Sequence, residues 1–186
     1  GPSPYPEEKR ALKKNAAQMP GIAVFNDDIR DGIKGSFKDD VMRGFATGDT
    51  TLDESVKFGI VAATSHPQIN YGKVNYSSAP YSVHPYQSIN YVSSHDDLNL
   101  VDKLQISNPD ASQEDLLKYD KLAQTIVFTS QGVPFMFNGE EVFRSKKGVH
   151  NSFQSPDSIN KINWTNKSIY KDLYTYYKAL ISLRKN

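Results

Sequence analysis

The residues best suited to chemistry are a histidine and two carboxylates that stand directly after an apolar strand start. Residues 91–94 (YVSS) lead into His95, Asp96 and Asp97. Histidine and carboxylate groups transfer protons and stabilise charge in enzymes. In a barrel of parallel strands, such groups meet the substrate when they lie at the carboxyl end of a strand. The segment therefore predicts a functional site at the end of a strand.

The same residues have two other interpretations. Ser-His-Asp-Asp is also ordinary loop sequence, in which an aspartate caps a helix over residues 98–104. Histidine and aspartate are metal ligands as well, but His66, His84 and His150 show no ligand spacing. We therefore expect no metal site, and the loop interpretation stays open until the rest of the sequence is considered.

Three further segments favour a functional site over an ordinary loop. Residues 24–31 (VFNDDIRD) precede the histidine segment, and residues 132–141 (GVPFMFNGEE) and 145–160 (SKKGVHNSFQSPDSIN) follow it. In this order and at these intervals, the segments resemble the last part of the catalytic barrel of type I pullulanases. These enzymes are debranching members of the α-amylase superfamily of glycoside hydrolases. The resemblance extends over nearly the whole chain, and several linked motifs are more specific than one.

The resemblance implies an activity for the parent protein. The family hydrolyses α-1,6 branch linkages in pullulan, amylopectin and related α-glucans with retention of configuration. Retention uses two carboxyl groups about 5 Å apart, one as nucleophile and one as acid/base. The family carries them on its fourth and fifth strands, and this chain contains neither motif. The isolated chain is therefore expected to be inactive.

The resemblance also implies roles for individual residues. Asp96 is expected to bind the hydroxyls of the cleaved sugar and to stabilise the oxocarbenium-like transition state, while His95 donates to the same ring. The family usually has asparagine where this chain has Asp97. We expect Asp97 to bind substrate too. A second carboxylate beside Asp96 adds negative charge and so changes the electrostatics of the site.

Other polar residues carry less specific expectations. Asn151 and Asn160 lie in a segment resembling one near the family's substrate cleft, where amides can bind sugar hydroxyls, and they suit turns equally well. Trp164, the only tryptophan, suits packing on the last helix as well as stacking on glucose. Ion pairs are expected for Asp27, Asp28, Arg30 and Asp31, and supporting roles for Glu140 and Glu141.

Composition limits the kind of partner. The 186 residues are 38% hydrophobic and 11% aromatic, enough for the core of one domain. Basic and acidic residues number 22 and 21, so we expect neither nucleic acid nor an anionic membrane as partner. No apolar run approaches the roughly 20 residues that span a bilayer. A neutral α-glucan suits this balance.

The apolar pattern predicts alternating strands and helices. Buried strands are expected at residues 22–25, from residue 91, and at 133–137, with helices at 6–19, 48–63, 98–104, 112–132 and 169–184. This order implies parallel strands with helical crossovers. Because a complete barrel takes about 250 residues, we expect an α/β fold that forms part of a (β/α)8 TIM-type barrel. It would comprise strands six to eight with their helices, in one domain spanning residues 1–186.

Partners and alternatives follow from an incomplete barrel. The chain is expected to join the missing N-terminal half of the barrel, or to self-associate through exposed strand edges. We expect no cofactor in this chain, and calcium is possible in the parent. One alternative is an amylase relative with α-1,4 or mixed specificity. Another is a non-catalytic α-glucan-binding or assembly protein that keeps the cleft without the nucleophile.

Overall fold

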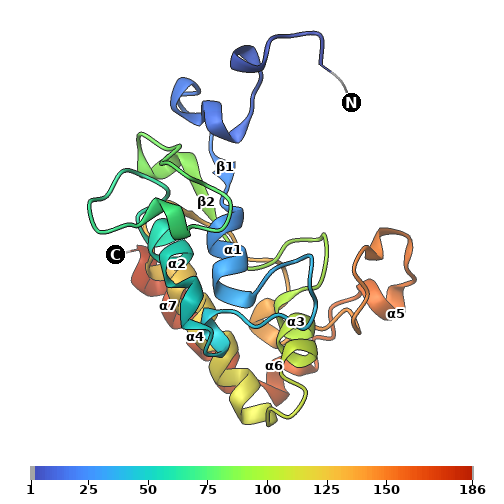
Figure 1. The fold of residues 1–186 in the computed structure, drawn as a ribbon. Coiled ribbons are helices and arrows are strands. Elements are labelled where there is room, and N and C mark those ends of the chain that lie inside the picture. The colour runs from blue at the N-terminus through green and yellow to red at the C-terminus, as the bar shows by residue number, and fades with distance from the viewer. Residues whose placement is uncertain (1–2, 186) are drawn as a thin grey trace.

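Three short parallel strands form one sheet, and the first two of them lie between the N-terminal segment and the helical body (Figure 1). The computed structural model describes residues 3–185. Strand β1 (Val24–Phe25) pairs with β2 (Ser88–Asn90), and β2 pairs with β3 (Val133–Pro134), so the order is β1-β2-β3. Val24 is opposite Ser88, and Ile89 is opposite Val133. The carboxyl ends of all three strands therefore lie at the same end of the sheet, which we call its carboxyl edge.

Helices connect and cover the strands, which confirms the predicted α/β fold with parallel strands and helical crossovers. Two helices lie between β1 and β2, two lie between β2 and β3, and three follow β3. They are α1 (Asp27–Lys34), α2 (Asp53–Ile60), α3 (Leu100–Ser107), α4 (Gln113–Thr129), α5 (Asp157–Asn160), α6 (Asn166–Ile169) and α7 (Lys171–Lys185). Short 3-10 helices occupy Glu7–Lys9, Lys13–Gln18, Phe45–Thr47, Thr50–Leu52, Tyr71–Lys73, Pro85–Gln87, Glu140–Val142 and Ser152–Gln154.

Local capping explains where the helices begin. Ser112 accepts a hydrogen bond from the Asp115 N–H at the start of α4, in agreement with the predicted helix start at residue 112. The start of α3 differs from the prediction, because Asn99 rather than an aspartate caps it by accepting from the Asp102 N–H. Helix α1 was not predicted at all. Asn26 caps it through the Ile29 N–H, at 3.2 Å.

Close packing between α1 and α2 builds the core next to the sheet. A Cβ added to Gly59 would lie 2.3 Å from the Cβ of Ile29, so the two helices meet at a position that requires glycine. The main core then continues through the inner faces of α3, α4 and α7. Its buried members include Ile29, Ile33, Val56, Leu100, Leu104, Ala123, Val127, Leu173 and Tyr177.

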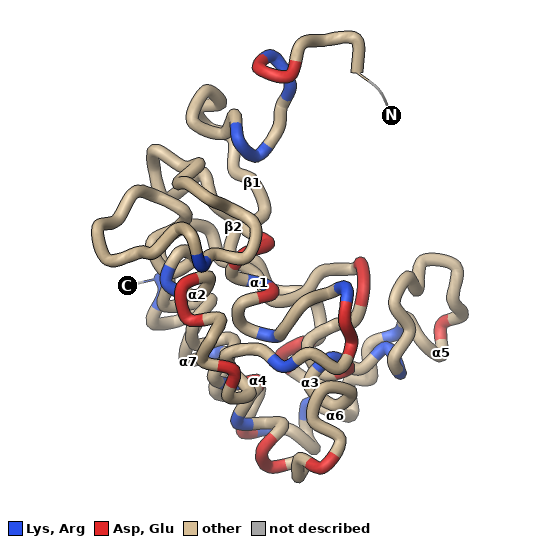
Figure 2. Tube along the Cα trace, viewed as in Figure 1, with Lys and Arg blue, Asp and Glu red and all other residues tan. Residues whose placement is uncertain are grey.

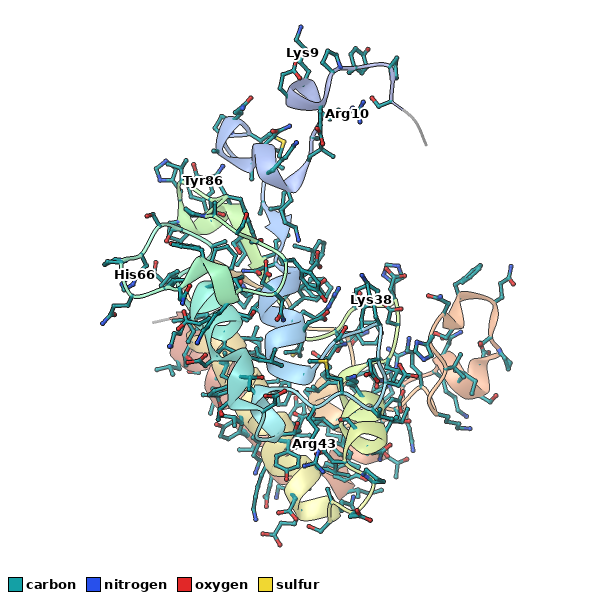
Figure 3. All side chains as sticks on the ribbon, viewed as in Figure 1. Lys9, Arg10, Lys38, Arg43, His66 and Tyr86 are labelled. Atoms are coloured by element: carbon teal, nitrogen blue, oxygen red, sulfur yellow. The ribbon has the colours of Figure 1, made fainter. Side chains whose placement is uncertain are left out.

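The prediction of a helix over residues 6–19 is wrong. The structure has two 3-10 helices there, separated by extended backbone at Arg10 and Leu12. The Asn15 amide donates to the carbonyls of Glu7 and Arg10, both at 2.8 Å, so it competes with helical pairing of those groups. In Figure 3 the labelled Lys9 and Arg10 lie on this segment, which projects from the helical body.

The strands also differ from the prediction in position and burial. The middle strand occupies Ser88–Asn90, before Tyr91 rather than from it, because backbone pairing with both neighbours includes the polar Ser88 and Asn90. The outer strands are not fully buried, since Phe25 is 42% exposed and Val133 is 41% exposed. Both lie on edge strands, where no further strand covers them within residues 3–185.

The irregular segment before β2 packs a second, smaller core. Tyr71 and Tyr81 make edge-to-face contacts with Phe58, at ring-centroid distances of 6.1 and 5.7 Å. Gln87 fixes the same segment by donating to the Ala16 carbonyl at 2.6 Å. The labelled His66 and Tyr86 lie on the outer side of this segment (Figure 3). Tyr71 and Tyr81 therefore serve as scaffold.

Charge is dispersed over the surface rather than gathered on one face. Figure 2 shows acidic and basic positions interspersed along the helices and loops. Among the described residues, no helix has the length and hydropathy that crossing a bilayer would require.

Candidate functional site

A cavity of about 440 Å³ lies where the three strands end. Phe25 ends β1, Tyr91 directly follows β2, and Phe135 directly follows β3, so each strand contributes an aromatic ring to the cavity. The other lining residues come from α1 and the turn after β2. They are Asp27, Arg30, Lys34, Ser94, His95, Asp96 and Asp97, together with Phe37 from the loop after α1.

His95 and Asp96 lie side by side at the cavity's rim. The His95 Nε2 is 3.0 Å from the Asp96 Oδ1, and the two side chains are 80% and 62% exposed. Their exposure leaves them accessible to a ligand. Asp97 lines the same cavity and has a left-handed backbone, with φ of 56°. The structure thus brings together three of the five residues that the sequence predicted for the site.

The aromatic rings form an apolar wall. The rings of Phe25 and Tyr91 meet edge to face with centroids 4.9 Å apart, and those of Phe25 and Phe135 with centroids 5.5 Å apart. The Arg30 guanidinium lies 4.7 Å from the centroid of the Phe37 ring. Lys38, labelled in Figure 3, lies 5.7 Å from the same centroid. Phe25 is 42% exposed and can pack against the apolar face of a sugar, whereas Tyr91 is buried and supports the wall.

A charged network links the ends of β1 and β2. Asp27 accepts hydrogen bonds from the Tyr91 hydroxyl at 2.7 Å, from Arg30 at 3.2 Å and from Lys13 at 2.5 Å. Partial burial acts to raise the pKa of Asp27, but the bonds from Lys13 and Tyr91 outweigh it and leave that pKa below its usual value. Asp27 is therefore held as a carboxylate anion.

The expected ion pairs of α1 are present for three of the four residues. Arg30 bridges Asp27 and Asp31, with its Nε 2.5 Å from the Asp31 Oδ1. Asp28 was wrongly included. It is fully buried and accepts hydrogen bonds from the N–H of Tyr76 at 2.7 Å and the hydroxyl of Ser77 at 2.6 Å. Asp28 therefore fixes the irregular segment to α1.

Glu140 lies behind the cavity wall rather than in it. Its buried carboxyl accepts from the Ser93 hydroxyl, from Gln124 at 3.0 Å and from the Phe137 N–H at 3.0 Å. Burial raises the pKa of Glu140 to about 7. Since Ser93 lies two residues before His95, Glu140 holds the segment that leads from β2 to His95. This agrees with the supporting role expected for Glu140.

Asn151 and Asn160 do not line this cavity. The Asn160 amide donates to the carbonyls of Ser152 and Ser155, at 2.6 and 2.9 Å, and so folds its own loop. Asn151 is exposed and precedes a 3-10 helix without capping it. Trp164 is 59% exposed. This segment lies beside α5, away from the strand ends (Figure 1).

Sequence reasoning missed two residues next to the site, Lys34 and Lys146. Both are buried, and both donate to carbonyls of the turn that carries His95 and Asp96. Lys146 lies in the motif SKKG, where two adjacent lysines suggest a solvated loop. For Lys34, the only signal of burial in the sequence is its spacing from Ile29 and Ile33, the apolar residues of the same helix.

No group of three or more histidine, cysteine, aspartate or glutamate side chains with metal-ligand geometry occurs within residues 3–185. A larger depression of about 680 Å³ lies elsewhere, between α3, α4 and the segment 142–170. It contains none of His95, Asp96 and Asp97. The smaller cavity at the strand ends is therefore the one that contains His95, Asp96 and Asp97.

Known proteins share this sequence and fold. Over 183 residues, 98% of its length, the chain is 39% identical to a pullulanase of Bacillus subtilis strain 168, and the match covers 24% of that protein. A chloroplastic pullulanase of Arabidopsis thaliana is 34% identical over 83 residues, which are 44% of this chain and 9% of that protein. No family model matches the chain.

Solved structures agree with the sequence matches. Type I pullulanase from Bacillus subtilis, crystallised with maltose, has a TM-score of 0.90 and 39% identity, covering 98% of this chain and 24% of that one. Pullulanase from Paenibacillus barengoltzii, in complex with maltohexaose and α-cyclodextrin, has a TM-score of 0.86 and 40% identity over 97% of this chain and 27% of that one.

In sequence and fold the chain is thus similar to a segment of known glycoside hydrolases. Within that class the chain is related to type I pullulanases. It spans about a quarter of the length of the relatives it matches.

Proposed function

We propose that this chain forms strands six to eight of the catalytic (β/α)8 barrel of a pullulanase-like glycoside hydrolase. The whole protein would hydrolyse α-1,6 linkages in pullulan, amylopectin or related α-glucans with retention. The observation that carries the proposal is the His95–Asp96 pair in a cavity at the carboxyl edge of three parallel strands. The maltose and maltohexaose complexes of the related pullulanases support an α-glucan as the ligand.

Asp96 is the transition-state stabiliser in this proposal. Its Oδ1 faces His95, and no side chain among residues 3–185 binds its Oδ2. The free oxygen can accept hydrogen bonds from sugar hydroxyls while the carboxylate stabilises the positive charge that develops at the anomeric carbon. His95 donates to the same sugar, and the aromatic wall packs against its apolar face. Asp97 is a further candidate for a hydroxyl contact.

The nucleophile and the acid/base are assigned to the rest of the protein. Retention needs two carboxyl groups about 5 Å apart that are free to react. Asp27 is already engaged by Lys13, Arg30 and Tyr91. The chain alone is therefore inactive in this proposal, and the edges of β1 and β3 receive the remaining strands of the barrel.

A reducing-sugar assay on pullulan tests the proposal. The chain would be assayed alone and as a hybrid, in which it replaces the matching segment of the Bacillus subtilis pullulanase. Activity in the hybrid and none in the chain alone supports the proposal, provided that Asp96→Ala abolishes the hybrid's activity. Activity of the chain alone contradicts the assignment of the missing carboxyl groups. Comparing pullulan with amylose separates α-1,6 from α-1,4 specificity.

One observation favours a second candidate, a non-catalytic α-glucan-binding protein. The cavity is built from this chain alone, with its aromatic wall and polar rim in place. This candidate predicts that the chain binds maltotetraose and loses binding in Asp96→Ala, while the hybrid does not hydrolyse pullulan. Isothermal titration calorimetry with the chain and the hybrid assay distinguish the two candidates.

A further inference from the structure

The turn that carries His95 and Asp96 has almost no main-chain support of its own. Among residues 3–185, no hydrogen bond between main-chain groups involves residues 94–98. The turn also contains the left-handed Asp97, a conformation that is unfavourable for residues other than glycine, although aspartate tolerates it better than most. Something other than regular secondary structure must therefore fix the turn.

Two buried lysines supply that support. The Lys146 ammonium donates to the carbonyls of Asp97 at 2.7 Å, His150 at 2.8 Å and His95 at 3.1 Å. The Lys34 ammonium, at the end of α1, donates to the Leu98 carbonyl at 2.9 Å. Three of the turn's carbonyls thus accept from lysine.

The burial of Lys146 shows that it is built into the structure. Only 1% of the residue is exposed, and an ammonium group has three donors, all of which are used here. A buried charge is tolerated only when it is fully hydrogen-bonded, so the three carbonyls and the lysine require one another.

Helix α3 fixes the main chain of Lys146. Asp102, buried on α3, accepts from the Lys146 N–H at 2.7 Å and from the Ser145 hydroxyl at 2.5 Å. Asn99, which caps α3, donates to the Arg144 carbonyl at 2.7 Å. The segment 144–146 is thereby held on α3, and α3 itself begins directly after the turn.

We propose that Lys146, assisted by Lys34, is a positioning residue that fixes the backbone of the His95–Leu98 turn and thereby aims His95 and Asp96 into the cavity. This inference rests on the proposed function only for its catalytic consequence. The structural part concerns the order of the turn and can be tested without substrate.

Hydrogen exchange on the full chain, followed by mass spectrometry, tests the structural part. Lys146→Met removes the ammonium and keeps a similar volume, and Lys147→Met is the matched control because Lys147 is exposed. The readout is the start of α3, directly after the turn, where the N–H groups of Asp102 and Lys103 donate to the side chain and the carbonyl of Asn99. We expect exchange of these two amides to accelerate at least tenfold in Lys146→Met and to stay unchanged in Lys147→Met. Exchange in the middle of α4 serves as the internal reference and should not change.

The same measurement can overturn the inference in two ways. Unchanged exchange at Asp102 and Lys103 would show that Lys146 does not order the turn that leads into α3. An equal acceleration in α4 would show that Lys146 supports the whole fold rather than the turn. Should Lys146→Met fail to melt cooperatively, Lys146→Gln retains one donor group without the charge, and the same two criteria apply to it.

Kinetics in the hybrid pullulanase test the catalytic consequence. Lys146→Met should lower kcat on pullulan at least tenfold with a smaller change in KM, whereas Lys147→Met should leave both unchanged. Unchanged kcat in Lys146→Met would refute the positioning role. An inactive hybrid with accelerated exchange in the chain would count against the proposed function while leaving the ordering of the turn established.

Discussion

The Tyr91 hydroxyl donates to the Asp27 carboxylate across 2.7 Å, and so joins the residue that directly follows β2 to the first residue of α1. The same hydroxyl accepts from Arg30 at 2.9 Å. One phenol thus connects an acid and a base from α1 to the end of the neighbouring strand. Asp27, Arg30 and Tyr91 line the same cavity as His95 and Asp96, so this connection holds part of the cavity wall in place.

Removing that hydroxyl should loosen the end of the sheet without removing the aromatic wall. Tyr91→Phe keeps the ring contacts with Phe25 and Phe135 but leaves Asp27 and Arg30 without their shared partner. We expect a loss of roughly 1 to 2 kcal/mol in the free energy of unfolding, typical of a hydrogen bond to charged groups. Urea denaturation measures it. Tyr119→Phe, whose hydroxyl makes no side-chain hydrogen bond within residues 3–185, should cost much less; equal losses would contradict this account.

Two buried titrating groups predict how stability depends on pH. Burial raises the pKa of Glu140 to about 7, so the folded state holds a proton that the unfolded state releases above its usual pKa of 4.5. Burial lowers the pKa of Lys34 to about 7 from the usual 10.5. The contribution of Glu140 therefore falls as pH rises from 4.5 to 7, and that of Lys34 grows as pH rises from 7 to 10.5. Together they give a minimum near pH 7.

Glu140→Gln isolates the acidic part of this profile. Thermal unfolding measured from pH 4.5 to 7 should show a decline on the order of 3 kcal/mol attributable to Glu140, and the variant should lack it. Glu114→Gln is the control, because the Glu114 side chain is 79% exposed. A wild-type decline that persists unchanged in Glu140→Gln would assign the effect to other groups.

The contact between α1 and α2 predicts a strong effect from one methyl group. Gly59→Ala places a Cβ 2.3 Å from the Ile29 side chain and forces the helices apart. Overpacking of this kind costs about 1 to 3 kcal/mol. Gly72→Ala meets nothing nearer than 3.3 Å and should be close to neutral. Differential scanning calorimetry compares the two, and a neutral Gly59→Ala would mean that the helices can separate without cost.

The exposed strand edges predict self-association of the isolated chain. Val133 is 41% exposed on the edge strand β3, which offers unpaired main-chain groups to a second copy. Light scattering should show a mass that rises with concentration, and Val133→Lys should reduce the rise. Val41→Lys is the control, since Val41 is 67% exposed but lies outside the sheet. A monodisperse monomer with cooperative melting would contradict this prediction.

Local signals in the sequence predicted those elements whose stability is local. The helix start predicted at residue 112 is confirmed because Ser112 caps α4 through the Asp115 N–H, and a cap acts within one turn. Helix α1 was missed because Asp28 and Asp31 look like surface residues. Their burial depends on Tyr76 and Ser77, more than 40 residues away, which no short window of sequence contains.

The same limit applies to the site. His95 and Asp96 after a strand suggested a site, but an ordinary loop explained them equally well until the other three segments were considered. Lys146 was missed because its neighbours in the sequence are polar and its three acceptors come from two separate turns. Buried positioning residues of this kind are decided by tertiary structure and carry no periodic signal.

The most direct test of the central claim is the activity of the hybrid pullulanase carrying Asp96→Asn. This change removes the charge and keeps the shape, so kcat on pullulan should fall at least about a thousandfold if Asp96 stabilises the transition state. Asp110→Asn, at an exposed position beyond α3, is the control and should leave kcat unchanged. A hybrid with Asp96→Asn that hydrolyses pullulan as fast as the unmodified hybrid would contradict the account.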